Sequence, residues 1–192
     1  RILELFSEDY GAQVIQADLV ARELEEPGQP GLTGLVSLFG NEILSPDGTL
    51  DRKRFADRIF GNPEALKRVN ALIHPLTWNE IKCRIRESKA DLVVVEAALF
   101  DERSRDICQY LVYVDTEDEV RIRRLMENRG YSREKCLGIM KNQADRSRFE
   151  ELADFVIDNS GPIDAARKQI GQMLDQIKQQ GKQMPPGATA ER

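Results

Sequence analysis

Four short runs of β-branched and aromatic residues, separated by long stretches with helical periodicity, constrain the fold of this chain more than any other feature. The runs are residues 12–16, 91–95, 110–114 and 154–158. Strands that alternate with helices in this way form a parallel sheet with crossover helices. Because each run is almost continuously apolar, we predict an α/β fold with a parallel sheet that is buried on both faces.

The stretch between the first two runs is too long for a single crossover. It contains about 70 mostly helical residues, which predicts an inserted helical subdomain at about residues 19–85. Asn62 followed by Pro63 is typical of a helix start, and Pro75 is expected to end or bend that helix. His74, the only histidine, would then lie at a helix end, where a packing or capping role is commoner than catalysis.

Positive charge is concentrated in residues 121–148. This segment holds nine bases and three acids, although the net charge of all 192 residues is −5. Such a segment could recruit a polyanionic ligand by its field as well as by contact. The alternative is a solvated helical face with many salt bridges, which is what many charge runs on helices are.

The same segment is predicted to form two helices joined by a short turn. Thr116 and Glu119 have the spacing of a capping box, Gly130 supplies a helix stop, and Ser132 caps the second helix. The helices follow the third predicted strand directly, and ligands of α/β proteins bind at that edge of the sheet. We therefore expect a phosphate-gripping lid over about residues 117–149.

Asp18 lies where the first predicted strand ends. A carboxylate at this edge can accept a proton from a substrate hydroxyl, and phosphoryl transfer needs little more than that and charge stabilisation. An aspartate at a strand-to-helix junction is as often a helix N-cap. One residue could serve both purposes, so the two interpretations of Asp18 both stay open.

Composition argues against several classes of protein. Charged residues make up 32% and hydrophobic residues 41% of the chain, as in soluble globular proteins, and no apolar run approaches the roughly 20 residues that span a bilayer. The acidic balance argues against nucleic acid as a partner. Cys83, Cys108 and Cys136 are odd in number and form no Cys-x-x-Cys pair, which argues against disulfides and structural zinc. A reducing cytoplasm is the expected setting.

A series of short segments up to about residue 178 has a specific order and spacing. The segments are Val14-Ile15-Gln16-Ala17-Asp18, Ala21-Arg22-Glu23-Leu24, Gly48-Thr49-Leu50-Asp51-Arg52, Ile59-Phe60, Asn62-Pro63-Glu64-Ala65-Leu66, Ile73-His74-Pro75-Leu76, Asn128-Arg129-Gly130 through Ser132-Arg133-Glu134 to Gln143, and Val156-Ile157-Asp158-Asn159-Ser160-Gly161. Together they resemble the dephospho-coenzyme A kinase family.

The resemblance implies a P-loop kinase-like three-layer fold with a parallel sheet, an inserted helical substrate subdomain and a helical lid. All of these parts belong to a single kinase domain. The expected division is a domain of residues 1–178 with its core in 1–18, 86–116 and 150–178, its substrate subdomain in about 19–85 and its lid in about 117–149, followed by a disordered tail at 179–192. The tail is expected because its residues lack apolar periodicity.

The implied activity is ATP-dependent phosphorylation of the ribose 3′-hydroxyl of dephospho-CoA. The products are CoA and ADP, the ion is Mg²⁺, and the step is the last one of coenzyme A biosynthesis. Asp18 matches the family's acidic residue that orients or deprotonates the hydroxyl. Arg129 matches the lid arginine that covers the transferring phosphate, where its charge would stabilise the equatorial oxygens.

Other residues follow from the same resemblance. Arg22, Asp51 and His74 fall on segments that contact the coenzyme, and Asn159 joins Arg129 on the nucleotide side. The implied partners are ATP and dephospho-CoA, with no nucleic acid and no membrane. We expect a cytoplasmic monomer or weak oligomer.

One departure from the family is large. No Gly-x-x-x-x-Gly-Lys-Ser/Thr occurs in the 192 residues, although in that loop backbone N–H groups cradle the phosphates and Lys reaches them. We therefore expect that a central strand, this loop and half a helix are missing before Arg1. A chain without them is expected to be inactive on its own.

Smaller departures concern single positions. Gln16 replaces a common Asp, and Ala97-Ala98-Leu99-Phe100-Asp101-Glu102 replaces Pro-Leu-Leu-Phe-Glu, with either Asp101 or Glu102 as the matching acid. In many members the lid arginine falls one position earlier, where Asn128 stands. A shift of one position turns a side chain by about 100° around the helix, which affects Arg129 directly.

Two other functions stay open. The chain could be a non-catalytic, kinase-derived binding module, or a truncated fragment, that keeps the coenzyme-binding helices without binding nucleotide. It could also be another small P-loop kinase, which would share the lid and Asp18 but not the Ile-His-Pro-Leu segment.

Overall fold

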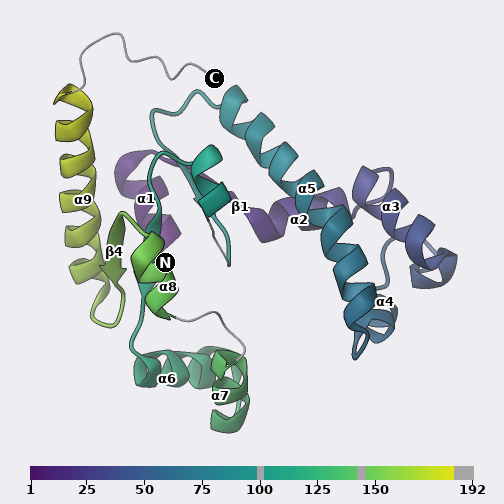
Figure 1. The fold of residues 1–192 in the computed structure, drawn as a ribbon. Helices are drawn as coiled ribbons and strands as arrows, with labels where there is room; N and C mark the ends of the chain where they lie inside the picture. The colour runs from purple at the N-terminus through teal and green to yellow at the C-terminus, as the bar shows by residue number, and fades with distance from the viewer. Residues whose placement is uncertain (99–101, 142–145, 184–192) are drawn as a thin grey trace. The chain divides into compact units, whose positions relative to one another are not determined.

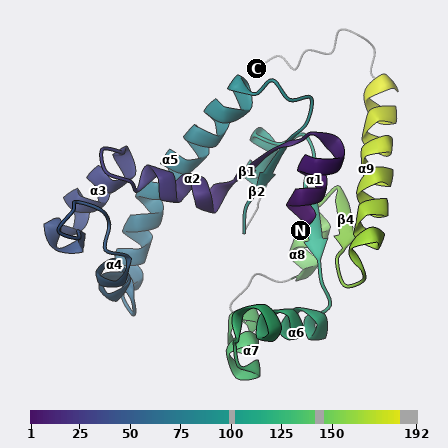
Figure 2. The same cartoon turned by 180° about the vertical axis from the view of Figure 1, so that it is seen from behind.

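The computed structural model describes residues 1–98, 102–141 and 146–183 of the chain (Figures 1 and 2). They belong to two units, which are described separately below. The N-terminal unit is Phe6–Ala98, and the C-terminal unit comprises Arg1–Leu5 with Leu99–Arg192. Helix α1 (Ile2–Tyr10) leads into the first strand.

The N-terminal unit contains one pair of parallel strands. β1 (Gln13–Gln16) pairs with β2 (Val93–Glu96), with Gln13 opposite Val93 and Gln16 opposite Glu96. At the beginning of β1, the hydroxyl of Ser88 donates to Oε1 of Gln13 over 2.6 Å. The first two predicted strands are confirmed to within two residues at each end.

The rest of the N-terminal unit is helical, as the stretch between the strands predicts. The helices are α2 (Ala17–Leu24), α3 (Pro30–Phe39), the 3₁₀ turn η1 (Asn41–Ile43), α4 (Arg52–Ile59) and α5 (Pro63–Glu87). Helices α2, α3 and α4 all contact the long helix α5, which can be followed in both views (Figures 1 and 2). Buried side chains of α3, η1, the segment before α4 and α5 form one core: Leu32, Leu35, Ile43, Leu50, Val69 and Ile73.

Helix α5 begins as predicted and ends later than predicted. The side-chain oxygen of Asn62 accepts from the N–H of Ala65 over 3.0 Å, and Pro63 is the first helical residue. Of the two expected effects of Pro75, an end of the helix is wrong, because α5 continues to Glu87, and a bend stays a prediction. The buried residues Ile73 and Thr77 flank Pro75 on one continuous buried face, and burial outweighs the single N–H that proline removes.

Helix α3 approaches its neighbours too closely for side chains at two positions. A Cβ on Gly31 would lie 2.4 Å from the backbone oxygen of Leu24. A Cβ on Gly34 would lie 2.7 Å from a methyl group of Leu72 in α5. The packing of α3 on α2 and α5 therefore depends on these two glycines.

The C-terminal unit also contains one pair of parallel strands. β3 (Val112–Asp115) pairs with β4 (Phe155–Asp158), with Val112 opposite Phe155 and Asp115 opposite Asp158. The helices of this unit are the 3₁₀ turn η2 (Glu102–Asp106), α6 (Asp118–Arg129), α7 (Arg133–Lys141), α8 (Arg146–Leu152) and α9 (Ile163–Gln183). Helix α9 packs on β4.

An ionic contact holds the beginning of this second strand pair. One carboxylate oxygen of Asp154 accepts from the N–H of Leu111 over 2.8 Å and from Nη1 of Arg105 over 3.1 Å. Beyond it, apolar side chains of the helices and of β4 are buried: Ile122, Phe149, Ile157, Ala166, Ile170, Met173 and Leu174.

The sheet differs from the prediction in two respects. Over the described residues the four strands hydrogen-bond as two separate pairs, β1 with β2 and β3 with β4, although the pairing is parallel as predicted. Burial on both faces is also wrong, since Val114 is 38% and Val156 46% exposed. A strand that is covered on one face only exposes its alternate side chains.

Helix α9 also corrects the predicted tail. It continues to Gln183, so residues 179–183 are helical, because propagating an existing helix adds one hydrogen bond per residue fixed. The rest of the predicted tail, residues 184–192, lies outside the described residues. The predicted division into core, subdomain and lid stays a prediction. Among the described helices, none is both long and apolar enough to cross a membrane.

Candidate active site

Asp18 is not a helix cap. It is the second residue of α2, and the cap position is taken by Gln16, whose side chain makes no capping hydrogen bond. An acid in the first turn is still favoured by the helix dipole. The Asp18 side chain is exposed, and within the described ranges no hydrogen bond or ion pair engages its carboxylate. The carboxylate is therefore free to accept a proton or a hydrogen bond from a ligand.

Glu96 is a second carboxylate at this edge, which sequence reasoning missed. It is the last residue of β2, and its register partner Gln16 lies two residues before Asp18. Burial raises the pKa of Glu96, and the nearby negative charge of Asp18 raises it further. The sequence signal that could have identified Glu96 is an acidic residue directly after the Val-Val-Val run of a predicted strand. The carboxyl ends of β1 and β2 thus bring two interacting carboxylates together.

Arg22 lies one helical turn after Asp18 in α2, so the two side chains share a face of the helix. Its side chain is exposed. Of the three residues predicted on the coenzyme side, Arg22 is the one that the local structure places next to Asp18.

Asp51 has a clear structural task. It is the N-cap of α4, where one carboxylate oxygen accepts from the N–H groups of Lys53 (3.1 Å) and Arg54 (3.0 Å). Its other oxygen pairs with Arg54 over 3.2 Å. These contacts account for the residue type at this position, and its predicted contact with the coenzyme stays a prediction.

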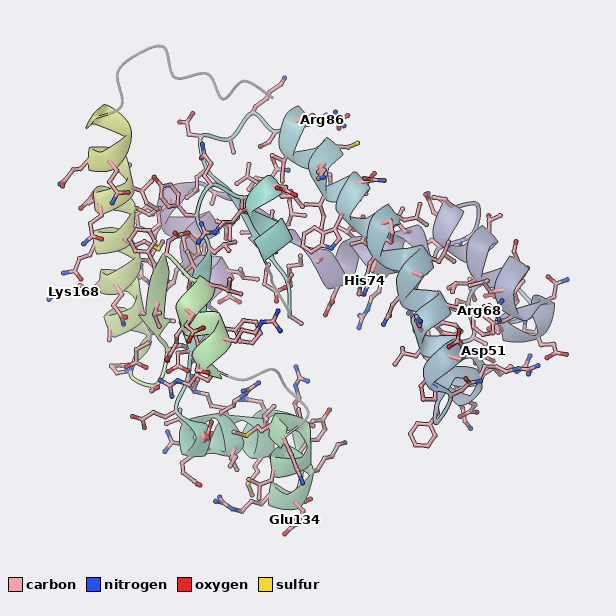
Figure 3. The ribbon with its side chains drawn as sticks, viewed as in Figure 1. Asp51, Arg68, His74, Arg86, Glu134 and Lys168 are labelled. Atoms are coloured by element: carbon pink, nitrogen blue, oxygen red, sulfur yellow. The ribbon has the colours of Figure 1, made fainter. Side chains whose placement is uncertain are left out.

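His74 lies midway along α5 and is exposed (Figure 3). The prediction of a helix end at this residue is wrong, because α5 runs through Pro75. Its ring is therefore neither packed nor in a capping position. Figure 3 shows Asp51 and Arg68 nearer the beginning of α5, where the Arg68 guanidinium lies 6.0 Å from the ring centre of Phe39. No hydrogen bond or ion pair between described residues joins His74 or Asp51 to Asp18.

Helices α6, α7 and the beginning of α8 carry the described bases of the basic segment in the C-terminal unit. Two of the predicted helix signals are confirmed: Gly130 ends α6 with a positive φ of 62°, and Oγ of Ser132 accepts from the N–H of Lys135 over 3.2 Å. The predicted capping box is wrong, because Glu117 holds the cap position without a side-chain bond. Glu119 accepts instead from Arg133, over 3.0 and 2.6 Å.

Several bases of this segment are paired, as the salt-bridge interpretation predicts. Arg133 pairs with Glu119 and lowers the pKa of that carboxyl. Arg146 lies 2.6 Å from the buried Asp115 at the end of β3 and 2.8 Å from Glu150. These three ion pairs neutralise part of the positive charge of the basic segment within the protein.

Arg129 keeps its charge available. It is the last residue of α6, where a cation is favoured by the helix dipole, and it is exposed. In the part of the chain that the structure describes, its guanidinium makes no hydrogen bond or ion pair. Asn128, the position of the lid arginine in many relatives, donates from its side chain to the backbone oxygen of Arg124 over 2.9 Å.

Asn159 is the first residue after β4 and is held by several bonds. Its N–H donates to the backbone oxygen of Asp115 over 2.7 Å. Its side-chain amide donates to the hydroxyl of Thr116 over 3.4 Å. Its backbone oxygen accepts from Nη1 of Arg124 over 2.6 Å. Sequence reasoning missed the partner Arg124, because its charge looks like that of every other base in the segment.

The register question at the end of β2 falls largely outside the description. Leu99, Phe100 and Asp101 lie outside the described residues, and nothing is described of the Glu102 side chain. Which of the two acids matches the family therefore stays open.

Known proteins of one family are similar to this chain over most of its length. The dephospho-CoA kinase family profile matches residues 2–165. A dephospho-CoA kinase of Corynebacterium jeikeium is 38% identical over 166 residues, covering 84% of this chain and 85% of the relative. The corresponding enzyme of Escherichia coli is 34% identical over 171 residues, covering 86% and 81%.

Solved structures show the same fold. A crystal structure from Thermus thermophilus has a TM-score of 0.76 at 25% identity, covering 92% of this chain and 90% of its own. Dephospho-CoA kinase from Campylobacter jejuni has a TM-score of 0.67 at 20% identity, covering 94% and 91%. With a matching family profile over most of its length and relatives above 30% identity, the chain belongs to the dephospho-CoA kinase family.

Proposed function

We propose that Asp18 and Arg129 are the residues with which this chain carries out the family's reaction. That reaction is the phosphorylation of dephospho-CoA, the final step of coenzyme A biosynthesis. The observation that supports the assignment most directly is the exposed carboxylate of Asp18 at the carboxyl end of β1, which no described residue engages. ATP would be the phosphoryl donor and the ribose 3′-hydroxyl the acceptor.

On the acceptor side, Asp18 would orient the 3′-hydroxyl and accept its proton as the new bond to phosphorus forms. Proton transfer by a positioned side chain contributes about 10²–10⁴-fold to a rate. Arg22 shares the helix face of Asp18 and would bind an anionic group of the same substrate. Asp51 and His74 would contact the coenzyme portion farther along the helical segments.

On the donor side, Arg129 would neutralise charge on the equatorial oxygens of the transferring phosphoryl group. Asn159, fixed at the end of β4, would contact the nucleotide. The chain would form a P-loop kinase-like three-layer fold, in which residues 117–149 close as a lid over the bound substrates and exclude water. Likeness to solved structures at high coverage supports this description.

Magnesium belongs to the proposal as the partner of ATP. Across the described ranges, no group of three or more His, Cys, Asp or Glu side chains could hold a metal ion. Kinase Mg²⁺ usually has one or two carboxylate ligands together with phosphates and waters, so such a group is not required. Glu96 at the end of β2 would fill this limited role, while Asp18 accepts the proton. When bound, the ion would neutralise charge on the ATP phosphates.

Several expectations stay predictions. The phosphate-binding loop does not occur in the 192 residues, and neither the structure nor the comparisons support the expectation that it and a strand are missing before Arg1. A cytoplasmic monomer or weak oligomer, with ATP and dephospho-CoA as its ligands, is likewise predicted.

The test is replacement of Asp18 by Asn in the full-length protein. We expect turnover of ATP and dephospho-CoA to fall about 10²–10⁴-fold, because the amide cannot take the proton. The melting temperature should change little, since Asp18 makes no hydrogen bond within the described residues. Asp175→Asn, which changes an exposed acid on α9, serves as the matched control.

Formation of CoA and ADP at saturating substrates is the measurement, with far-ultraviolet circular dichroism to follow folding. Unchanged turnover of folded Asp18→Asn protein would contradict the proposed role of Asp18. Wild-type protein that hydrolyses ATP but does not phosphorylate dephospho-CoA would contradict the proposed acceptor.

A further inference from the structure

Arg124 holds two backbone carbonyl groups of one loop, those of Asn159 and Gly161. From the middle of α6, its Nη1 donates to the backbone oxygen of Asn159 over 2.6 Å, and its Nη2 donates to the backbone oxygen of Gly161 over 3.3 Å. The planar guanidinium offers these two donors in a fixed fork, and a lysine ammonium cannot reproduce that geometry. Arg124 thus fixes the spacing of the two carbonyls as well as their position.

The same loop is held from three other directions. The N–H of Asn159 donates to Asp115 in β3 over 2.7 Å. The N–H of Ser160 donates to the carboxylate of Asp158 over 2.8 Å, and its hydroxyl accepts from the N–H of Glu117 over 2.9 Å. Residues 159–161, called the β4 loop below, are therefore fixed to β3, to β4 and to the beginning of α6. Arg124 supplies the bonds on the side of the helix.

The partners of Arg124 distinguish it from the other paired arginines of the basic segment. Arg133 and Arg146 each pair with carboxylates, which neutralise their charge. The Arg124 guanidinium donates to two neutral backbone oxygens, and in the described ranges no carboxylate pairs with it. A guanidinium on a helix that donates its hydrogen bonds to loop carbonyls is suited to fixing the conformation of that loop.

We infer that Arg124 is a positioning residue that holds the β4 loop in the conformation that binds the nucleotide. This inference rests on the proposed contact of Asn159 with ATP. Without Arg124 two loop carbonyls lose their partner and the loop samples other conformations. ATP binding then has to restore the ordered loop, which weakens binding without changing the chemical step.

The test is the affinity for ATP of Arg124→Gln, Arg124→Lys and the control Arg123→Gln in the full-length protein. Arg123 is the exposed neighbour on the same helix. We expect Arg124→Gln to raise the Kd and the KM for ATP about tenfold, the effect of losing one or two net hydrogen bonds. The KM for dephospho-CoA and kcat should stay within about twofold of wild type. The Kd for ATP of Arg124→Lys should lie between those of the wild type and Arg124→Gln. The Kd of Arg123→Gln should match that of the wild type.

Two results would overturn the inference. One is an unchanged Kd for ATP in folded Arg124→Gln protein, and the other is an equal loss of affinity for both substrates together with a lower melting temperature, which would mark a merely structural role. If Arg124→Gln does not fold, Ser160→Ala removes the acceptor of the Glu117 N–H together with the side-chain hydrogen bond between Ser160 and Asp158, and it should raise the Kd for ATP about threefold. An unchanged Kd in that variant would also count against the inference.

The two proposals fail in distinguishable ways. Wild-type protein that binds ATP but does not phosphorylate dephospho-CoA would refute the proposed function and leave the comparison of ATP affinities valid. Wild-type protein that binds no ATP, measured by titration calorimetry with MgATP, would overturn the role of the β4 loop itself.

Discussion

The two strand pairs are alike in size and direction but differ at their carboxyl ends. β1 with β2 and β3 with β4 are each four residues long and parallel. Asp18 and Glu96 lie at the carboxyl ends of β1 and β2, and their carboxylates form no hydrogen bond with any described residue. Asp115 and the β4 loop lie at the carboxyl ends of β3 and β4, and hydrogen bonds and an ion pair fasten them to their surroundings. The first edge is called open below and the second fastened.

This difference matches two kinds of chemical task. A group that exchanges a proton must be able to change its partner during the reaction, so a carboxylate without fixed bonds suits it. A surface that recognises a ligand works best when its shape is set beforehand, because ordering it on binding lowers affinity. The comparison therefore supports proton exchange at the open edge and ligand recognition at the fastened edge.

The amino ends of the same strands differ as well. A neutral hydrogen bond between Ser88 and Gln13 lies at the beginning of β1. An ionic contact between Arg105 and Asp154 lies at the beginning of β4. Only the second contact can be broken by protonation, so the two pairs should differ in their response to acid.

The largest expected effect concerns Arg129, the exposed last residue of α6, whose guanidinium pairs with no described residue. Arg129→Gln should lower kcat about 10²–10³-fold, the usual result of removing one donor that stabilises transition-state charge. Steady-state kinetics with both substrates would measure it, and Arg123→Gln is the control. A normal kcat would mean that another base covers the phosphoryl group.

The next effect separates the two edges by stability. Asp115→Asn should lower the free energy of unfolding by about 1–3 kcal/mol, because the buried carboxylate holds Arg146. Asp18→Asn should lower it by less than about 0.5 kcal/mol. Urea unfolding of both variants would measure the difference. Equal losses would show that the open edge is as tightly held as the fastened one.

A smaller effect depends on pH. Burial alone would raise the pKa of Asp154, but hydrogen bonds from Leu111 and Arg105 outweigh it, and the pKa lies below the ordinary value of 3.8. The ionised form is thus favoured in the folded state, so its stabilisation is complete above that value and is lost as the pH falls through the folded-state pKa. Asp154→Asn should therefore lower the free energy of unfolding by about 1 kcal/mol at pH 6 and by progressively less below pH 4.

Urea unfolding across this pH range measures the Asp154 contribution. Gln13→Ala, which removes the neutral contact of the other strand pair, is the control and should cost the same at every pH. A cost of Asp154→Asn that does not vary with pH would contradict the ionic role.

The smallest effect sharpens the description of the open edge. Because burial and the charge of Asp18 both raise the pKa of Glu96, Asp18→Asn should lower that pKa toward the ordinary value without reaching it. Carboxyl-carbon NMR titration of Glu96 in both proteins would measure the change. An unchanged pKa would show that the two carboxylates do not interact.

Local signals predicted the elements well. The four strands, the Asn62 cap and the Gly130 stop depend on neighbouring residues, and all are confirmed. The predicted capping box failed because its members have distant partners: the Thr116 hydroxyl accepts from Asn159, 43 positions away. Pro75 failed as a stop because a buried face continues on both sides of it.

The candidate site was only partly predictable for the same reason. Asp18 was predicted from its position at the end of a strand and Arg129 from the resemblance to the family, and both assignments stay predictions. Glu96 becomes relevant only through its register with Gln16, and Arg124 only through contacts with carbonyls 35 and 37 positions away. Pairings of this kind arise from folding and leave no mark on the residue type.

The two glycines of α3 limit which genetic changes this protein can accept. Every single-nucleotide missense change of a glycine codon adds at least a Cβ atom. At Gly31 that atom would collide with backbone, which cannot rotate away, whereas at Gly138 in α7 it would meet open space. Under selection for a folded enzyme, codon 31 should therefore stay fixed while codon 138 drifts freely.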